Sequence, residues 1–281
     1  MSHPIKIEDV ILKHPRRGLS TLRQSLGLDF CYDAAKSLFA CSRGVVFIIT
    51  GFYANGVAET DGPVGAYFLA NALQKLAFRP LIVTDPFCRD FFSYKPETET
   101  LYMPLEGTAP YLEVLNRYNP VCLIAVERCG RNADLKYCNV KNTDISEFTA
   151  PLDEFFILAN NTTLTIGIGD GGNEIGMGNL RRVIAEKLHI SPCIIDTKHT
   201  VIATTSNWGA YGLMAYLTML SNLSLLPDFS DVDPYLDHIL SLGSVDGITG
   251  SNSKSVDGLD WTTEKEVLDE LKKITQQTRR E

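Results

Sequence analysis

Residues 163–189 read TLTIGIGDGGNEIGMGNLRRVIAEKLH and contain a complete strand, loop and helix pattern. The run 163–168 has the apolar and β-branched composition of a short buried strand. Five glycines follow within ten residues, and 178–189 then shows the apolar spacing of a helix. A strand that leads through a tight loop into a helix indicates one unit of a parallel sheet covered by helices.

The same order recurs along the chain. Further strands are predicted at 45–50, 80–84, 100–103, 121–126 and 200–204, with a weaker run at 193–195. Helices are predicted at 64–77, 109–118 and 208–222, and at 18–42 before the first strand. This alternation predicts an α/β fold, a doubly wound, mostly parallel sheet with helices on both faces. A TIM barrel is the alternative, but the number and uneven spacing of the strands fit it poorly.

The chain is expected to form a single α/β domain over residues 1–281. From 225 to 281 the composition shifts to Asp, Ser, Gly and Pro, which predicts a loop-rich C-terminal extension that closes on the site. Helices are predicted within it at 233–242 and 262–279. The tripeptide Val-Asp-Gly occurs there twice, at 245–247 and 256–258, and is typical of a turn.

The composition narrows the class of partner. The 34 acidic and 26 basic residues give a net charge of −8, which argues against nucleic acid or a membrane surface. The seven cysteines include no C-x-x-C pair, so neither a zinc site nor a disulfide framework is indicated. The N-terminus lacks the apolar core of a signal peptide, and no apolar run reaches the ~20 residues of a membrane span. We therefore expect a cytoplasmic protein that acts on a small molecule.

Polar side chains follow four of the predicted strands. Ligands bind beyond the carboxyl ends of parallel strands, so these side chains are the candidates for a site. Glu59 and Asp61 follow the first strand, and Asp61 is also placed to cap the next helix. Glu127 and Arg128 follow the strand at 121–126. Arginine suits the bidentate capture of a substrate carboxylate.

The glycine-rich loop of the quoted stretch is the strongest single signal. It contains Asp170, Asn173 and Glu174, and its glycines, among them Gly171 and Gly172, can expose N–H groups to an anion. It lacks the lysine and hydroxyl residue of a P-loop, and it does not match the dinucleotide-binding fingerprint. A structural loop seldom needs this many glycines and acids together, so the loop favours a functional site.

Ser206 and Asn207 follow the last strand, where either can cap the helix that begins there. Each of the four segments has an ordinary structural explanation when it is taken alone. Together they would bring their acids, amides and arginine above one edge of the sheet, which is the pattern of a catalytic cavity.

Two alternatives to that interpretation remain open. The carboxylates of Glu59, Asp61, Asp170 and Glu174 could hold Mg²⁺ in a metal-dependent phosphoryl or nucleotide hydrolase. The same crevice could also serve a non-catalytic amino-acid-binding protein. Turnover of a substrate by the purified protein separates the second alternative from an enzyme.

Several motifs occur together along nearly the whole chain: Arg17-Gly18, ITGF (49–52), AETDGP (58–63), VTD (83–85), ERCGRNAD (127–134), GIGDGGNEIGMGN (167–179), SNWGAY (206–211) and the two Val-Asp-Gly units. In this order they resemble the D-glutamate cyclase family. Leu135, Cys138 and Asn142 depart from its usual pattern of glycine, an aromatic residue and glycine. The resemblance implies reversible cyclisation of D-glutamate to 5-oxo-D-proline with loss of water, a hydro-lyase reaction, by a stand-alone form without the N-terminal domain of mitochondrial members.

Ring closure needs a base for the α-amine, an activated γ-carboxylate and an acid for the departing water. We expect Asp170 as the base and Glu127 as the acid, with Asn173 and glycine N–H groups holding the developing oxyanion. Arg128 is expected to fix a carboxylate of the acidic amino acid. The other candidates are expected to bind substrate: Glu59, Asp61, Gly171, Gly172, Glu174, Ser206 and Asn207. No organic cofactor is expected. A divalent cation, Mg²⁺ or Mn²⁺, and a homo-oligomer are compatible with the sequence, which assigns no protein ligand to a metal.

Overall fold

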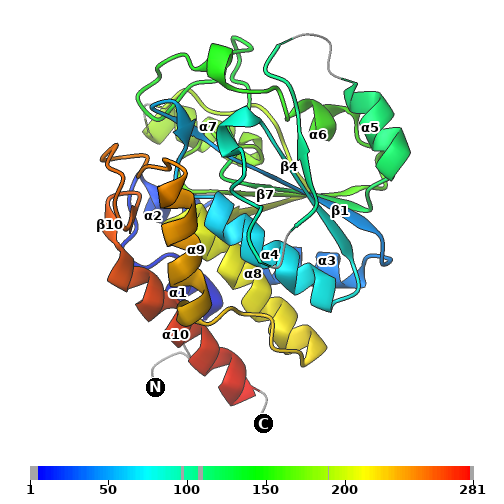
Figure 1. Cartoon of the computed structure of the whole chain (residues 1–281), viewed down its shortest axis with the longest axis vertical. Coiled ribbons are helices and arrows are strands. Elements are labelled where there is room, and N and C mark those ends of the chain that lie inside the picture. The colour runs from blue at the N-terminus through cyan, green and yellow to red at the C-terminus, as the bar shows by residue number, and fades with distance from the viewer. Residues whose placement is uncertain (1–5, 96–97, 107–109, 189, 279–281) are drawn as a thin grey trace.

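The computed structural model describes residues 6–95, 98–106, 110–188 and 190–278. Its central feature is a sheet of six parallel strands in the order β5-β4-β1-β6-β7-β8 (Figure 1). Their bounds are β1 Val45–Thr50, β4 Arg79–Thr84, β5 Thr100–Tyr102, β6 Cys122–Val126, β7 Leu164–Gly169 and β8 His199–Ile202. Counted along the chain, this is the order 3-2-1-4-5-6 of a doubly wound sheet. The predicted fold class is confirmed, and the sheet is open rather than a closed barrel.

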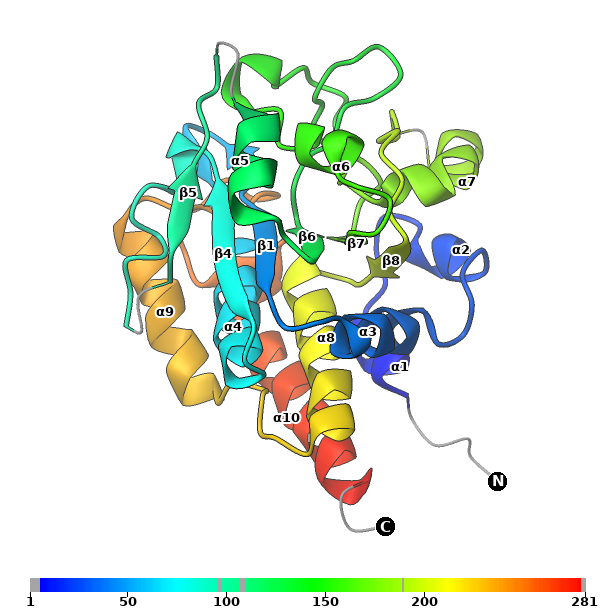
Figure 2. The same ribbon diagram turned by 90° about the vertical axis from the view of Figure 1, so that its right-hand side faces the viewer.

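Helices cover both faces because alternate strand residues point to opposite sides. Phe47 and Ile49 of β1 pack in one core with α5 (Tyr111–Tyr118) and α6 (Glu154–Leu158). Val46 and Ile48 face the larger core. That core contains α3 (Phe30–Ala40), α4 (Pro63–Lys75) and α8 (Ser206–Ser221). Figure 2 shows the two layers from the side.

Two predicted elements are wrong. The helix expected over 18–42 is two helices, α2 (Leu19–Arg23) and α3, separated by a segment that contains Gly27. The weak run at 193–195 is not a strand, because its amides bond irregularly to loops, as in the Cys193 amide to the carbonyl of Gly172 (3.0 Å). The predicted helix 178–189 begins as the 3-10 turn η3 (Met177–Leu180) and continues as α7 (Arg181–Lys187).

Residues 109, 189 and 279, at which predicted helices begin or end, lie outside the described residues. Several short elements were not predicted: α1 Ile7–Ile11, β2 Tyr53–Ala54, β3 Val57–Ala58, η1 Pro86–Cys88, η2 Ser146–Phe148, β9 Ser255–Val256 and β10 Leu259–Asp260. β2 and β3 form a hairpin around Asn55-Gly56, both at positive φ, as the tight two-residue turn requires.

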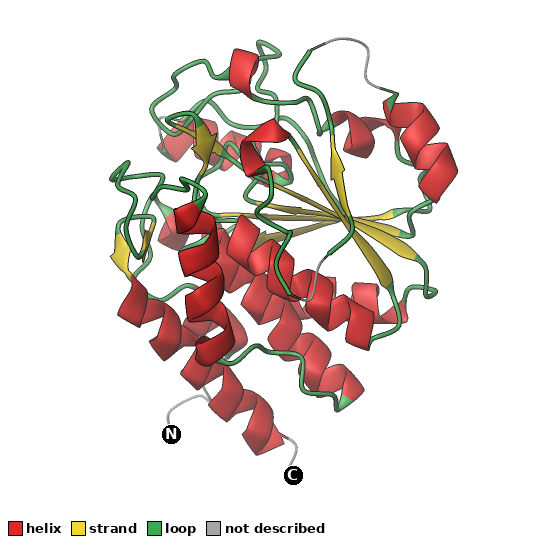
Figure 3. Ribbon diagram, viewed as in Figure 1, coloured by secondary structure: helices red, strands yellow, loops and turns green. Residues whose placement is uncertain are grey.

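The C-terminal segment is more helical than its composition suggested. It contains α9 (Phe229–Ser241) and α10 (Trp261–Thr278), with loops between them (Figure 3). α10 packs on α8, where the indole N–H of Trp208 donates to the buried carboxylate of Glu264. No helix in the described part of the chain is long and apolar enough to cross a membrane.

Burial raises the pKa of Glu264 to about 7, against the opposing hydrogen bond from Trp208. A raised pKa means that the folded state holds the proton more tightly than the unfolded state. This contribution to stability is therefore complete below pH ~4.5 and is lost as the pH rises to about 7. Glu264→Gln keeps an acceptor for the indole but cannot ionise.

We expect the free energy of unfolding of the wild type to fall, relative to Glu264→Gln, by up to about 3 kcal/mol between pH 5 and pH 8. Urea denaturation across that range measures the difference. Glu266→Gln removes an exposed acid of the same helix and should keep the wild-type slope. Parallel pH profiles for wild type and Glu264→Gln would show that Glu264 is not the titrating group.

Candidate active site

The site lies where β1 and β6 are neighbours and the chain leaves them in opposite directions, which is the switch point of the sheet. α4 begins there after Gly62, whose φ is +96°. A Cβ added at Gly62 would lie 2.7 Å from the Cβ of Glu127. Glycine therefore allows the first turn of α4 to approach the acid that follows β6.

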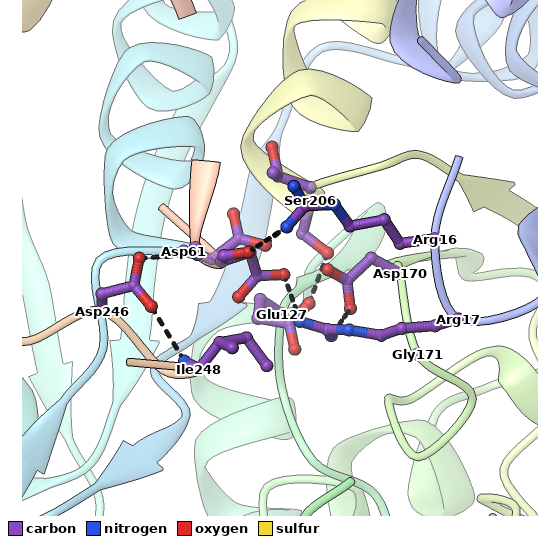
Figure 4. A network of polar contacts seen from close by, with 12 residues as sticks. Arg16, Arg17, Asp61, Glu127, Asp170, Gly171, Ser206, Asp246 and Ile248 are labelled. Atoms are coloured by element: carbon purple, nitrogen blue, oxygen red, sulfur yellow. Dashed lines mark hydrogen bonds and ion pairs between the residues drawn. The ribbon is translucent and has the colours of Figure 1, made fainter. Parts of the chain in front are cut away.

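Three carboxyl groups meet at this point (Figure 4). Asp61, Glu127 and Asp170 each offer one oxygen, and these oxygens all lie within 4.8 Å of one another. None of the three residues is more than 3% exposed. The sequence predicted that these acids would converge, and the structure places them together; we call them the acid cluster.

The acid cluster holds protons more tightly than isolated carboxylates do. Burial raises the pKa of Glu127 well above its ordinary value, and the nearby Glu174 and Asp61 add to the increase. Burial and Asp257 likewise raise the pKa of Asp61. Burial also raises that of Asp170, although Arg17 opposes it. Ionisation of all three close, buried acids at once is therefore unfavourable.

Arg17 was missed as a site residue and appeared only in the family motif. Its guanidinium bridges two acids, with Nη1 2.6 Å from Oδ1 of Asp170 and Nη2 2.6 Å from Oδ2 of Asp257. Its side chain is 18% exposed and lines the cavity described below. Arg17 thus ties the N-terminal segment and the C-terminal segment to the loop after β7.

Asp61 and Asn207 cap each other's helices. Asp61 was expected to cap α4, but the N-cap of α4 is Gly62, and of the amides at the start of α4 the Asp61 carboxylate accepts only that of Gly62. It also accepts the amides of Ser206 (2.7 Å) and Asn207 (2.8 Å) at the start of α8. The side-chain oxygen of Asn207 accepts the amides of Gly62 (3.0 Å) and Gly65 (2.7 Å) of α4.

The cap predicted for α8 therefore needs correction. Its N-cap is Thr205, whose hydroxyl accepts the amide of Trp208, and not Ser206 or Asn207. The hydroxyl of Ser206 instead donates to Glu127 at 2.6 Å. Ser206 and Asn207 are both fully buried and do not line the cavity. Ser206 contacts Glu127, and Asn207 binds the first amides of α4.

The amides of the glycine-rich loop bind the side chain of Glu174, which belongs to the same loop. The carboxylate of Glu174 accepts the amides of Gly171 (2.9 Å) and Gly172 (2.7 Å). These two N–H groups are consequently not available as an oxyanion nest, which corrects the substrate-binding role predicted for both glycines. Asn173 points its amide to the carbonyl of Cys138 (2.8 Å) and lines the cavity.

Arg128 is also placed differently from the prediction. It is 1% exposed, and its guanidinium donates to Asp85 (2.5 Å) and to the carbonyls of Gly51 and Ala150 (both 2.6 Å). It does not line the cavity. Arg128 therefore cross-links the ends of β1 and β4 to the loop before α6, and the expectation that it fixes a substrate carboxylate is corrected.

A cavity of about 460 Å³ opens over the switch point. Its polar wall, which we call the floor, consists of the partly exposed Arg17 and the buried residues Glu59, Glu127, Asn173, Glu174 and Asp257. Four of these six were predicted from the sequence, while Asp61 and Asp170 adjoin Glu127 without lining the cavity. Burial and Asp257 raise the pKa of Glu59 well above its ordinary value.

The two Val-Asp-Gly units shape this floor together. Asp246 of the first accepts the amides of Ile248 (2.9 Å) and Thr249 (2.8 Å), and also the amide of Gly258 in the second (2.7 Å). The second unit presents Asp257, at a positive φ of 53°, to Arg17. The loop 247–250 thereby lines the cavity. The repeat is thus an interlocked pair of turns that positions an ion-pair partner.

The acid cluster also has the donor type of a divalent-cation site, because Mg²⁺ and Mn²⁺ prefer carboxylate oxygens. Both oxygens of Asp61 already accept backbone amides, and Oδ1 of Asp170 faces Arg17. Oδ2 of Asp170 is buried and has no hydrogen-bond partner among the described residues. Asp170 and Glu127 are therefore the two residues of the cluster that could hold such an ion.

The strand order and the floor define an α/β protein with an acidic small-molecule cavity at the switch point of its sheet. The chain belongs to the family described as D-glutamate cyclase-like, C-terminal, whose model matches residues 7–272. It is 29% identical over 231 residues to a human protein named D-glutamate cyclase, mitochondrial. That match covers 72% of this chain and 38% of the human protein, so the chain spans well under half of its relative's length.

Because Arg128 is a buried structural residue, we expect its loss to reduce the stability of the fold. Arg128→Met would leave Asp85 as an unpaired buried acid, and we expect it to lower the free energy of unfolding by about 3–5 kcal/mol. Arg79→Met is the matched control, because its ion pair with Glu99 is exposed and should contribute at most about 1 kcal/mol. Urea denaturation of both variants measures the contrast. Equal stability of the two, with turnover lost only in Arg128→Met, would return Arg128 to substrate binding.

Proposed function

We propose that this chain is a D-glutamate cyclase, a hydro-lyase that converts D-glutamate into 5-oxo-D-proline and water. The observation that carries the proposal is the buried acid cluster, which lies beside Arg17 and reaches the floor of the cavity through Glu127. Membership of the D-glutamate cyclase-like family supports it. Because the chain spans 38% of the human relative, the relative's activity enters as part of this proposal.

The reaction is a transfer of protons within one molecule. The α-ammonium group carries three protons and the lactam nitrogen of the product carries one. Two protons therefore move from nitrogen to the γ-oxygen, the C–N bond forms, and the C–O bond breaks as water leaves. A set of coupled carboxyl groups with raised pKa values can accept protons at one oxygen and supply them at another.

Asp170 and Glu127 are the pair that we assign to this transfer. Oδ2 of Asp170 is a buried acceptor that no described residue satisfies, and it lies next to Glu127 outside the cavity, so we assign it the proton of the amine by way of the Glu127 carboxyl group. Glu127 lines the cavity and receives the hydroxyl hydrogen bond of Ser206, which orients it toward the departing oxygen. Asn173, whose amide is oriented by the Cys138 carbonyl, is assigned to the developing oxyanion.

Arg17 takes over the role that was expected of Arg128. Two of its five N–H donors contact Asp170 and Asp257, and the remaining donors can bind the α-carboxylate of the substrate. A dicarboxylate would be repelled by a fully ionised floor. The raised pKa values of Glu59 and Glu127 favour the neutral forms of these groups, which would reduce that repulsion.

The phosphoryl hydrolase alternative has less support. A phosphate site needs exposed N–H groups or several cations. The amides of Gly171 and Gly172 bind Glu174, and the floor is mainly acidic. A divalent cation at Asp170 and Glu127 is retained as an accessory to be tested. When bound, it would polarise a carboxyl oxygen of the substrate.

Purified protein should convert D-glutamate to 5-oxo-D-proline, measured by chiral chromatography with and without Mg²⁺ or Mn²⁺ and after chelation. L-Glutamate is the matched control for stereochemical preference. Binding of D-glutamate without product under every one of these conditions would instead identify a non-catalytic amino-acid-binding protein.

Asp170→Asn should retain the fold and the binding of D-glutamate but lose roughly a hundredfold or more in turnover, as expected for a general base. Asp144→Asn is the matched control. Asp144 lines the same cavity but is exposed, so its variant should keep most of its turnover. Circular dichroism and calorimetric titration check folding and binding. Near-normal turnover of Asp170→Asn would move the base to Glu59 or Glu174.

A further inference from the structure

The cavity has a second wall that D-glutamate does not explain. Its outer lining includes an apolar group, Tyr53, Phe148 and Ile248, which we call the rim; the exposed polar residues Asn55, Lys141, Thr143, Asp144 and Thr249 line the cavity as well. Phe148 is 39% exposed and Ile248 is 45% exposed, whereas the acids of the floor are buried. The cavity therefore has a buried polar floor and, among the mixed side chains nearer the solvent, one apolar group.

The rim is an ordered structure built from three separate segments. Tyr53 of the β2–β3 hairpin stacks on Phe148 of η2, with ring centroids 4.5 Å apart and planes at 11°. Phe87 packs on Tyr53 in a T-shaped contact, with ring centroids 4.7 Å apart. On the C-terminal loop, the amide of Ile248 is held by the Asp246 carboxylate. Two aromatic rings and an aliphatic side chain are thus kept at the mouth.

Free glutamate has no apolar group large enough to pack against the rim. Its amine and both carboxylates require polar partners, which the floor supplies. A cavity of about 460 Å³ falls within the ~300–1,000 Å³ of pockets that enclose drug-sized ligands, and one amino acid does not fill it. Apolar side chains at the mouth of a pocket contribute binding energy when the ligand carries an apolar group.

We propose that the same site also accepts γ-amides of D-glutamate whose amine part is apolar or aromatic, and releases that amine while forming 5-oxo-D-proline. This inference rests on the proposed cyclase function, because it uses the same floor and the same attacking nitrogen. The rim is the subsite for the departing amine. The group on the γ-carbon must leave through the mouth, so its substituent lies against the rim while Arg17 retains the α-carboxylate.

The chemistry balances without a further reactant. The α-nitrogen attacks the γ-carbonyl carbon, the new lactam C–N bond forms, and the old amide C–N bond breaks. The α-ammonium group loses two protons: one goes to the departing nitrogen, which leaves as the neutral amine, and the other goes to solvent or, for a basic alkylamine, to the released amine. Glu127, which supplies the proton to the leaving oxygen of D-glutamate, supplies it here to the leaving nitrogen.

The test compares three substrates with the purified full chain: D-glutamate, γ-D-glutamyl methylamide and γ-D-glutamyl anilide. 5-Oxo-D-proline and the released amine are both quantified, which distinguishes cyclisation from hydrolysis to glutamate. We expect kcat/KM for the anilide to exceed that for the methylamide by about tenfold or more, the usual scale for an apolar contact in a pocket.

Phe148→Ser should lower this anilide-to-methylamide ratio about tenfold by removing one half of the aromatic stack. Leu135→Ser is the matched control, since Leu135 is 68% exposed and does not line the cavity, and it should keep the wild-type ratio. Thermal denaturation confirms that both variants fold. A preference that survives Phe148→Ser would overturn the assignment of the rim.

The outcomes separate this inference from the proposed function. Cyclisation of D-glutamate with no reaction of either amide overturns the inference and leaves the cyclase function standing. Reaction of the amides without turnover of D-glutamate supports the inference and refutes the cyclase function as proposed. Failure of all three substrates with folded protein overturns both.

Discussion

Two helices, α4 and α8, begin side by side at the switch point of the sheet, and their first N–H groups are buried. Buried amides need acceptors, and at this position solvent cannot supply them. Each helix start supplies the acceptor for the other: Asp61, before α4, accepts the first amides of α8, and Asn207, in α8, accepts the first amides of α4. This arrangement joins segments that are about half the chain apart and brings an acid into the sheet's carboxyl edge.

The acid cluster follows from that constraint. Once Asp61 is held between the helix termini, the turns after β6 and β7 place Glu127 and Asp170 beside it. Their proximity and burial make ionisation of all three at once unfavourable. The helix-capping arrangement and the proposed chemistry therefore share one set of side chains.

Both ends of the chain complete the floor. Arg17 comes from the segment before β1 and Asp257 from the turn between β9 and β10, and Arg17 pairs with both Asp257 and Asp170. The floor contains one arginine, Arg17, among four acids. A substrate carboxylate can therefore bind at one defined place, beside carboxyl groups that can exchange protons. An apolar rim at the mouth adds a second preference to this polar interior.

The fold class could be predicted because its signals are local. β1 was predicted over its full range, 45–50, and the other strands to within one or two residues at each end, since buried parallel strands are short continuous apolar runs. The break between α2 and α3 was missed because the apolar spacing continues across it. Convergence of Glu127 and Asp170 could also be predicted, since parallel strand ends share one edge.

The sequence by itself thus determined the fold class, the loops that carry the acids, and the glycines that allow these loops and the adjoining helices to pack closely. Only the tertiary structure decided which partner each polar side chain has. Arg128 and Arg17 are the same residue type, yet Arg128 forms a buried ion pair with Asp85 while Arg17 lines the cavity. Hydrogen-bond partners are set by contacts between distant segments, and no local periodicity records them.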